Sequence, residues 1–252
     1  MSPAERRSRI QKIVQTQGFV TIEHLAREFD VTPQTVRRDI NILSREGLIQ
    51  RFHGGAGMGF STENVAYTER KIMCYQEKQQ IARMVAQHIP EHASLFINIG
   101  TTTEAVAQAL ADHHKLTVIT NNLNVANILS GNENFEVLVA GGLLRPRDGG
   151  LIGQATIDFI QQFKVDFGII GISGIDFDGT LLDFDYREVR AARTIIDNSR
   201  KVFLVTDHSK FGRNAMVRLA SINEIHALFT DQQPPAPIVE AIAKAEVQLF
   251  VV

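Results

Sequence analysis

Residues 32–40, Thr-Pro-Gln-Thr-Val-Arg-Arg-Asp-Ile, decide how the N-terminal part of this chain folds. Thr32 is a favourable N-cap and Pro33 suits the first helical position, so a helix is predicted to begin here. Its apolar residues recur at helical spacing and predict one buried face: Val36, Ile40 and Leu43. The other side chains lie mostly off that buried face, where they can reach bases and phosphates in a major groove. We therefore expect DNA contacts from Thr32, Gln34, Thr35, Arg37, Arg38 and Asn41.

Two earlier segments predict partners for this helix. Thr21 can cap a short helix, and residues 30–32 make a turn just long enough to set the next helix across it. Residues 3–17 predict a further helix that ends at Gly18. This pattern is typical of a helix-turn-helix in which the second helix reads DNA.

A small basic wing is predicted after the reading helix. Gly47 breaks the helix, residues 48–53 can form a strand, and residues 54–55 can form a tight turn. Arg51 and His53 would then lie near the DNA backbone. Paired amphipathic helices also occur in small domains that bind no DNA, but the turn length and the two adjacent arginines favour a winged helix-turn-helix.

The charge distribution supports a division of the chain. Its 252 residues are 44% apolar and 21% charged, with a net charge of only −2, which is ordinary for a soluble globular protein. Residues 1–57, however, hold nine Lys and Arg against six Asp and Glu, whereas the remainder holds 17 against 22. A basic N-terminal part on an acidic body fits a DNA-binding module joined to another domain.

Cysteine usage and hydropathy indicate a cytoplasmic protein. The single Cys74 allows no intrachain disulfide and fits a reducing compartment. No apolar run reaches the roughly 18 residues that span a bilayer, and the N-terminus lacks the apolar core of a signal peptide. We expect no membrane partner.

The body of the chain predicts an α/β domain. We assign a DNA-binding domain to residues 1–57, a glycine-rich linker to residues 58–76 and a sensing domain to residues 77–252. The predicted helices of the sensing domain are 77–89, 103–113, 123–129, 157–163, 188–198 and 238–245. They alternate with apolar strands at 95–99, 116–120, 135–140, 165–171, 201–206, 224–230 and 247–252. Such alternation predicts a largely parallel sheet covered on both faces.

The ends of these strands predict a ligand pocket, because open α/β sheets bind ligands beyond the carboxyl ends of their strands. Gly100, Thr101, Thr102 and Thr103 follow one strand and open a helix, where hydroxyls and free backbone N–H groups suit a phosphate. The loop lacks the lysine of a nucleotide P-loop, which favours a small phosphorylated metabolite. Equally, a threonine there can simply cap the helix.

Other strand ends supply further candidates. Lys210 can place an ammonium on the phosphate, although a single lysine is more often an exposed surface residue. Polyol hydroxyls can be met by Asp148, Asp183, Asp185 and Glu188, each of which could instead be a solvated carboxylate or the partner of an arginine. The remaining candidates are Asn121, Asn122, Gly142 and Arg147. The histidines are scattered, and we predict no metal site, no catalytic set and no cofactor.

At this point the chain resembles the DeoR family of bacterial repressors nearly end to end. The N-terminal signature is Arg6-x3-Ile10-x3-Val14, then, after seventeen residues, Thr32-x2-Thr35-Val36-Arg37-Arg38-Asp39-Ile40. The body carries Ile99-Gly100-Thr101-Thr102, Thr120-Asn121-Asn122, Arg147-Asp148-Gly149-Gly150, Gly171-Ile172-Ser173-Gly174, Phe184-Asp185-Tyr186-x-Glu188 and Asp207-His208-Ser209-Lys210. The family usually has an aspartate two residues before Gly100, where this chain has Asn98.

The resemblance implies a sensor domain similar to ribose-5-phosphate isomerase in fold. It also implies repression of genes for glycerol-phosphate uptake and catabolism, relieved by glycerol 3-phosphate as the effector. A different sugar or polyol phosphate remains an alternative effector. Operator DNA and the metabolite are the expected partners. A homodimer or homotetramer is expected because symmetric repressors read paired half-sites.

Two rival functions stay open from the sequence. One is a phosphosugar isomerase, but that enzyme's Asp-Gly-Ala-Asp motif falls on Ile170-Gly171-Ile172-Ser173, so the positions of both aspartates are occupied by residues that cannot transfer protons. We therefore expect binding without catalysis. The other is a sensor whose N-terminal helices only dimerise, which predicts little need for Arg37 and Arg38.

Overall fold

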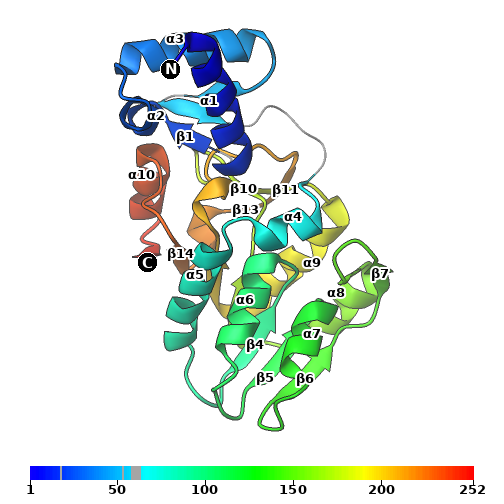
Figure 1. Cartoon of the computed structure of the whole chain (residues 1–252). Helices are drawn as coiled ribbons and strands as arrows, with labels where there is room; N and C mark the ends of the chain where they lie inside the picture. The colour runs from blue at the N-terminus through cyan, green and yellow to red at the C-terminus, as the bar shows by residue number, and fades with distance from the viewer. Residues whose placement is uncertain (18, 53, 58–63) are drawn as a thin grey trace.

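A computed structural model describes residues 1–17, 19–52, 54–57 and 64–252 (Figure 1). An N-terminal head, formed by the elements from α1 to β3, lies over one end of a larger α/β sensor, formed by the elements from α5 to β15. His53, a predicted wing contact, lies outside the described residues.

The head contains the predicted helix-turn-helix. Its helices are α1 (Pro3–Gln17), α2 (Ile22–Glu28) and α3 (Pro33–Arg45). The Thr21 hydroxyl accepts a hydrogen bond from the His24 amide at 3.1 Å, and the Thr32 hydroxyl accepts one from the Thr35 amide at 3.2 Å. Both predicted caps are therefore present. The apolar faces of the three helices meet in one small core that includes Ile10, Val14, Leu25, Val36, Ile40 and Leu43.

The wing differs from its prediction. Gly54 precedes a short strand, β3 (Gly55–Gly57), which lies in the centre of a sheet of order β1-β3-β2, between β1 (Phe19–Thr21) and β2 (Gln50–Phe52). The predicted tight turn over residues 54–55 is therefore wrong for Gly55, which lies in the strand β3. Gly55 is required by close approach, because an added Cβ would lie 2.5 Å from the ring of Phe19.

A buried ion pair joins the first and third helices of the head. Arg6 of α1 donates from Nε to Asp39 of α3 at 2.6 Å, and both side chains are buried. Asp39 thus belongs to the interior of the head rather than to its DNA-facing surface. The pair fixes the angle at which the reading helix leaves the core.

Replacing Thr32 by alanine is expected to lower the free energy of unfolding of the head by about 1 kcal/mol, because α3 would lose its side-chain N-cap. Thermal unfolding followed by circular dichroism would measure the change. Gln34→Ala, at an exposed position of the same helical turn, is the matched control and should stay within about 0.5 kcal/mol of the parent. Equal stability of the two variants would contradict a capping role.

The sensor is built on a seven-stranded parallel sheet of order β15-β14-β12-β9-β4-β5-β6. All seven predicted strands are present, as β4 (Ser94–Ile97), β5 (Thr117–Thr120), β6 (Glu136–Val139), β9 (Val165–Ile170), β12 (Ser199–Val205), β14 (Ala227–Thr230) and β15 (Gln248–Val251). The predicted helices are α5 (Tyr75–Gln87), α6 (Thr101–Ala109), α7 (Leu123–Leu129), α8 (Gln154–Ile160), α9 (Tyr186–Asp197) and α10 (Ala236–Lys244).

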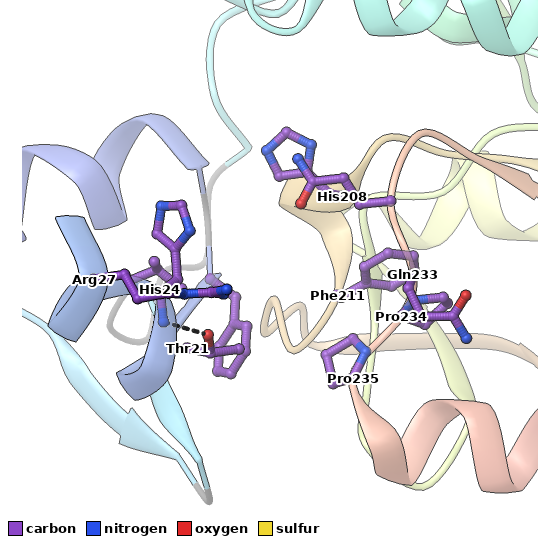
Figure 2. A pocket seen from close by; sticks show the side chains of 11 residues that line it. Thr21, His24, Arg27, His208, Phe211, Gln233, Pro234 and Pro235 are labelled. Carbon is purple, nitrogen blue, oxygen red and sulfur yellow. Dashed lines mark hydrogen bonds between the residues drawn. The ribbon is translucent and has the colours of Figure 1, made fainter. Parts of the chain in front are cut away.

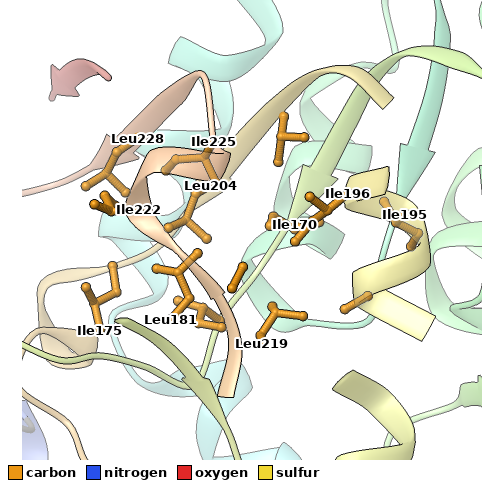
Figure 3. Close-up of a cluster of buried hydrophobic side chains, with 14 of the residues drawn as sticks. Ile170, Ile175, Leu181, Ile195, Ile196, Leu204, Leu219, Ile222, Ile225 and Leu228 are labelled. Carbon is orange, nitrogen blue, oxygen red and sulfur yellow. The ribbon is translucent and has the colours of Figure 1, made fainter. Parts of the chain in front are cut away.

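Two apolar clusters cover the two faces of this sheet, because successive side chains of a strand point to opposite faces. Leu95 and Ile97 of β4 pack with α5, α6 and α7, whereas Phe96 between them belongs to the cluster on the other face. In that second cluster Ile195 of α9 packs with Leu204 of β12 (Figure 3). The helices on both faces leave the carboxyl edge of the sheet free for polar loops.

Several elements were not predicted. A hairpin of β7 (Leu143–Arg145) and β8 (Gly150–Ile152) and a small sheet of β10 (Gly174–Ile175), β11 (Thr180–Asp183) and β13 (Val217–Ser221) occupy segments for which no helix or strand was predicted. The helix α4 (Tyr67–Ile72) lies within the stretch that was assigned to the linker. Two short 3-10 helices also occur, η1 (His208–Lys210) and η2 (Ile222–Glu224). These elements are too short to show periodicity.

The head contacts the sensor beside the small sheet. The ring of Phe19 in β1 meets the ring of Phe177 edge-on, with 5.4 Å between the ring centroids. A cavity remains next to this contact, with Thr21, His24 and Arg27 of the head on one side and His208, Phe211 and the segment 232–235 of the sensor on the other (Figure 2). On the sensor side, His208 is paired with Asp231 at 2.5 Å.

Candidate functional site

The reading helix α3 presents its predicted contact residues outside the head core. Gln34, Arg37 and Arg38 are exposed, while Val36 on the opposite face is fully buried. Their position on one open face leaves both arginines free to meet phosphates or base edges.

Other predicted DNA contacts already have partners within the head. The hydroxyls of Thr32 and Thr35 are hydrogen-bonded to each other at 2.9 Å. Asn41 accepts a hydrogen bond from Arg51 at 2.9 Å, which joins α3 to the strand β2. Thr32 and Arg51 are exposed, and Thr35 and Asn41 are half-buried. These residues can therefore order the DNA-facing surface as well as touch it.

A cavity lies at the carboxyl ends of the central strands of the sensor, where the sequence predicted a ligand. We call it the effector cavity. Its lining comes from the loops after β4, β9 and β12, from α9 and β11, and from the segment before α5: Asn64, Arg70, Ile99, Gly100, Thr101, Thr102, Gly171, Ile172, Ser173, Asp183, Glu188, Lys210 and Arg213. Of the predicted ligand residues, the structure brings together Gly100, Thr101, Thr102, Glu188 and Lys210.

Two cations in this cavity are buried without a close ion pair. Lys210 is 8% exposed and Arg213 is 9% exposed, and in the described part of the chain neither has a carboxylate oxygen within 4.0 Å. Arg213 donates only to neutral oxygens, the Ser173 carbonyl at 3.2 Å and the Asn64 side chain at 2.9 Å. Burying such charges is costly unless an anion joins them.

The electrostatics of the cavity follow from this burial. Burial lowers the pKa of the Lys210 ammonium to about 8, although Asp207 opposes the shift. Burial, together with the neighbouring Arg70, also lowers the pKa of Arg213. Both groups would regain their usual affinity for a proton beside a bound anion.

The carboxyl groups of the cavity do not offset these charges fully. Burial raises the pKa of Asp183, which accepts a hydrogen bond from Ser173 at 3.0 Å. Burial and the nearby Asp183 raise the pKa of Glu188 to about 8, and they outweigh Arg145, whose guanidinium lies 2.6 Å from the Glu188 carboxyl. Near neutral pH the cavity therefore favours an anion, and a protonated Glu188 can donate a hydrogen bond as well as accept one.

The hydroxyls of the threonine loop, residues 101–103, have two different surroundings: two lie at the cavity, and one is bonded to the backbone. Thr101 and Thr102 line the cavity at the start of α6, where free backbone N–H groups favour a phosphate. Thr103 instead is fully buried and donates its hydroxyl to the Asn98 and Gly100 carbonyls, each at 2.8 Å. Its role here is to close the loop.

The other predicted ligand residues surround the cavity without lining it. The Asn121 amide donates to the Leu151 carbonyl at 3.0 Å. Asn122 caps α7 by accepting from the Asn124 amide at 2.9 Å. The Thr156 side chain and the Ile152 carbonyl approach Gly142 so closely that an added Cβ would clash with both. These residues hold the loops that shape the sheet edge.

Arg147 and Asp148 also lie outside the lining of the cavity. Asp148 is buried, and two Arg145 nitrogens reach its two oxygens at 2.8 Å each, so that its hydrogen-bonding capacity is largely used. Arg147 has an exposed side chain that lies 3.4 Å from Asp185. Both residues belong to the charged network beside the cavity.

Three residues of the cavity were missed by the sequence reasoning. Asn64 and Arg70 fall in the assigned linker, which shows no apolar periodicity, and Arg213 was given no role although it closely follows the segment Asp207-His208-Ser209-Lys210. The signal that could have found Arg213 is its place three residues after Lys210, on the same strand end.

The described residues contain neither a helix long and apolar enough to cross a membrane nor a cluster of His, Cys, Asp and Glu placed to hold a metal ion.

Comparison with known proteins places both parts of the chain. The family described as "DeoR-like helix-turn-helix domain" matches residues 6–62, and "DeoR C terminal sensor domain" matches residues 73–232. The "Glycerol-3-phosphate regulon repressor" of Escherichia coli K12 is 53% identical over 249 residues and covers 99% of each chain. The protein of the same name from Haemophilus influenzae is 52% identical over 234 residues, which cover 93% of this chain and 91% of that one.

Among solved structures, ribose 5-phosphate isomerase A from Methanocaldococcus jannaschii matches 55% of each chain, with a TM-score of 0.41 and 10% identity. The predicted fold class, a winged helix-turn-helix followed by a mostly parallel α/β sensor, is confirmed by the sheet topology and by the two family matches. This chain belongs to the DeoR family.

Proposed function

We propose that this protein is a transcriptional repressor of genes for glycerol 3-phosphate metabolism, and that glycerol 3-phosphate releases it from operator DNA. One observation supports the effector half of the proposal: among the described residues, the buried cations Lys210 and Arg213 form no close ion pair, and they lie at the sheet edge where this fold binds ligands. The high identity to two proteins named as glycerol-3-phosphate regulon repressors supports the choice of metabolite.

The cavity offers complementary chemistry to the two ends of this ligand. A phosphate dianion fits the side formed by Lys210, Arg213 and the start of α6, with Thr101 as a hydroxyl donor. Asp183 and Glu188 are available for the glycerol hydroxyls. Polar groups buried in this way reject ligands that leave them unpaired, which is how a small site gains specificity.

The DNA half of the proposal depends on α3. Gln34, Arg37 and Arg38 would contact the operator in the major groove, with Thr32, Thr35 and Asn41 beside them and Arg51 of the wing near the backbone. Paired half-sites require a homodimer or homotetramer. The effector lowers DNA affinity only by its own preference for a form of the protein that reads DNA poorly, typically by about 1–3 kcal/mol.

Isomerase activity is not part of the proposal. The positions that match the two aspartates of the isomerase motif are Ile170, a buried apolar side chain, and Ser173, a buried neutral hydroxyl that donates to Asp183. Neither can take up a proton from a substrate. The chain is a regulator, as its family membership implies.

Capture of sheared genomic DNA by the purified protein, with and without glycerol 3-phosphate, tests the proposal. We expect discrete fragments to be retained and to be released by glycerol 3-phosphate. Release by another sugar or polyol phosphate alone would replace the effector but keep the repressor. No retention even at low salt, where phosphate contacts are strongest, would remove the DNA-binding function.

Effector affinity is expected to fall as the pH rises from about 7 to about 9. Above the pKa of Lys210, loss of its proton should lower the affinity by roughly tenfold for each pH unit. Lys210 and Glu188 both have a pKa of about 8 in the empty cavity. Above that pH Lys210 loses its positive charge and Glu188 gains a negative one, so both changes oppose a phosphate dianion. Calorimetry in buffers of different ionisation heat should show proton uptake on binding near pH 8. Constant affinity over this range would contradict the assignment.

A further inference from the structure

The segment 64–72 leads from the head into the sensor, and hydrogen bonds hold it across the carboxyl edge of the sensor sheet. Its helix α4 is held through Tyr67, whose hydroxyl donates to buried Glu104 of α6 at 2.8 Å and accepts from Asn124 at 3.0 Å. Lys78 of α5 donates to the Met73 carbonyl at 2.6 Å and also to the Arg70 carbonyl at the end of α4. The segment is thus bonded to three helices of the sensor.

Two side chains of this segment form part of the wall of the effector cavity. Asn64 donates to the Ser173 hydroxyl at 3.0 Å and accepts from Arg213 at 2.9 Å, so it bridges two loops of the sensor. Arg70 lines the same cavity close to Lys210 and Arg213. The cavity is therefore incomplete without residues that belong to the connection between the two domains.

The ion pair of Arg70 inside the protein is a weak one. Its guanidinium lies 3.6 Å from Asp148, a carboxylate that two nitrogens of Arg145 already hold at 2.8 Å. A phosphate dianion in the cavity offers Arg70 a better partner, because it has several free oxygens and guanidinium groups bind phosphate with paired hydrogen bonds. Arg70 can therefore exchange its contact with Asp148 for a bound phosphate.

We propose that Arg70 binds the phosphate of the effector, and that effector binding thereby changes how tightly the segment 64–72 is held. This inference rests on the proposed function and deepens it, because it assigns the contact through which an occupied sensor acts on the head. Lys210 and Arg213 hold the phosphate from the sensor side, and Arg70 holds it from the side of the connecting segment. The head follows a segment whose position depends on the ligand.

The test compares Arg70→Gln with Lys71→Gln, which removes the same charge from an exposed neighbour on the same helix. Calorimetry should show that Arg70→Gln weakens the binding of glycerol 3-phosphate by about tenfold, the usual effect of losing one charged contact. Inorganic phosphate, which lacks the glycerol part, should lose a similar factor. Lys71→Gln should bind both ligands like the parent. Operator affinity without effector should stay within about twofold of the parent for Lys71→Gln, because this exposed residue belongs neither to the reading head nor to the effector cavity.

Arg70→Lys separates a phosphate contact from a structural role, since it keeps the charge and loses the guanidinium geometry. We expect it to recover part of the affinity for both ligands. Unchanged binding of both ligands by Arg70→Gln would overturn the inference, and so would a loss that appears for glycerol 3-phosphate but not for inorganic phosphate. If the parent protein binds inorganic phosphate but not glycerol 3-phosphate, the proposed effector fails, while the phosphate measurement still decides the role of Arg70.

Discussion

Replacing Lys210 by methionine is expected to weaken effector binding by about 10- to 150-fold while operator binding in the absence of effector is retained. Hydrogen bonds to charged groups contribute about 1.5–3 kcal/mol, and the buried setting of Lys210 favours the upper part of that range. Methionine keeps most of the volume of the side chain without its charge. Titration calorimetry with glycerol 3-phosphate measures the loss, and an operator-release assay should show a matching rise in the effector concentration needed.

Lys244→Met is the matched control for this experiment. Lys244 is exposed at the end of α10, and its replacement should leave both affinities unchanged. Thermal unfolding of the Lys210 variant should also be compared with the parent, because buried Asp207 would lose the nearby positive charge that helps to lower its pKa. A folded Lys210 variant that responds normally to the effector would remove Lys210 from the phosphate site.

The sequence predicted the repetitive parts of this fold well because their signals are local. Val36 and Ile40 repeat at helical spacing, and all seven strands of the sensor sheet are apolar runs separated by helical patterns. Lys210 and the threonine loop could be placed at one edge because parallel strands end on the same side of a sheet. That rule needs no knowledge of tertiary contacts.

The parts that sequence reasoning missed depend on contacts between distant segments. Arg70 lines the cavity because hydrogen bonds from Lys78 and between Tyr67 and Glu104 hold α4 in place. The local sequence around Arg70 gives no sign of these contacts. Gly55 was interpreted as a turn residue, whereas its lack of a side chain serves the close approach of Phe19. Asp148 was expected to face a ligand, yet its charge is taken up by Arg145, a pairing visible only in three dimensions.

The arrangement of the two domains explains how a small ligand can control a distant helix. The head touches the sensor through Phe19 and Phe177, and η1 carries Lys210 toward the effector cavity while His208 of the same turn lines the cavity beside the head. The connecting segment 64–72 provides a second link. In the proposed mechanism, these two links would let the effector alter the position of the head, provided that the ligand prefers one arrangement over the other.

Simultaneous replacement of Arg37 and Arg38 by alanine is expected to reduce operator affinity by at least about 30-fold, since each arginine that contacts a base contributes about 1–3 kcal/mol. Both side chains are exposed on α3 and neither belongs to the head core, so the variant should fold like the parent. The dependence of binding on salt should also become shallower, because fewer phosphates are neutralised. Fluorescence anisotropy with labelled operator DNA at several salt concentrations measures both effects.

The control for this variant is the double variant Arg83→Ala, Arg200→Ala, which removes two exposed arginines from the sensor. Its net charge therefore equals that of the Arg37, Arg38 double variant. It should bind the operator within about threefold of the parent, since charges far from the DNA act only through screened long-range attraction. Both double variants should bind glycerol 3-phosphate normally, because the effector cavity contains none of the four residues. Equal operator affinity of the two double variants would mean that α3 does not read the operator, and the head would then be better explained as a dimerisation module.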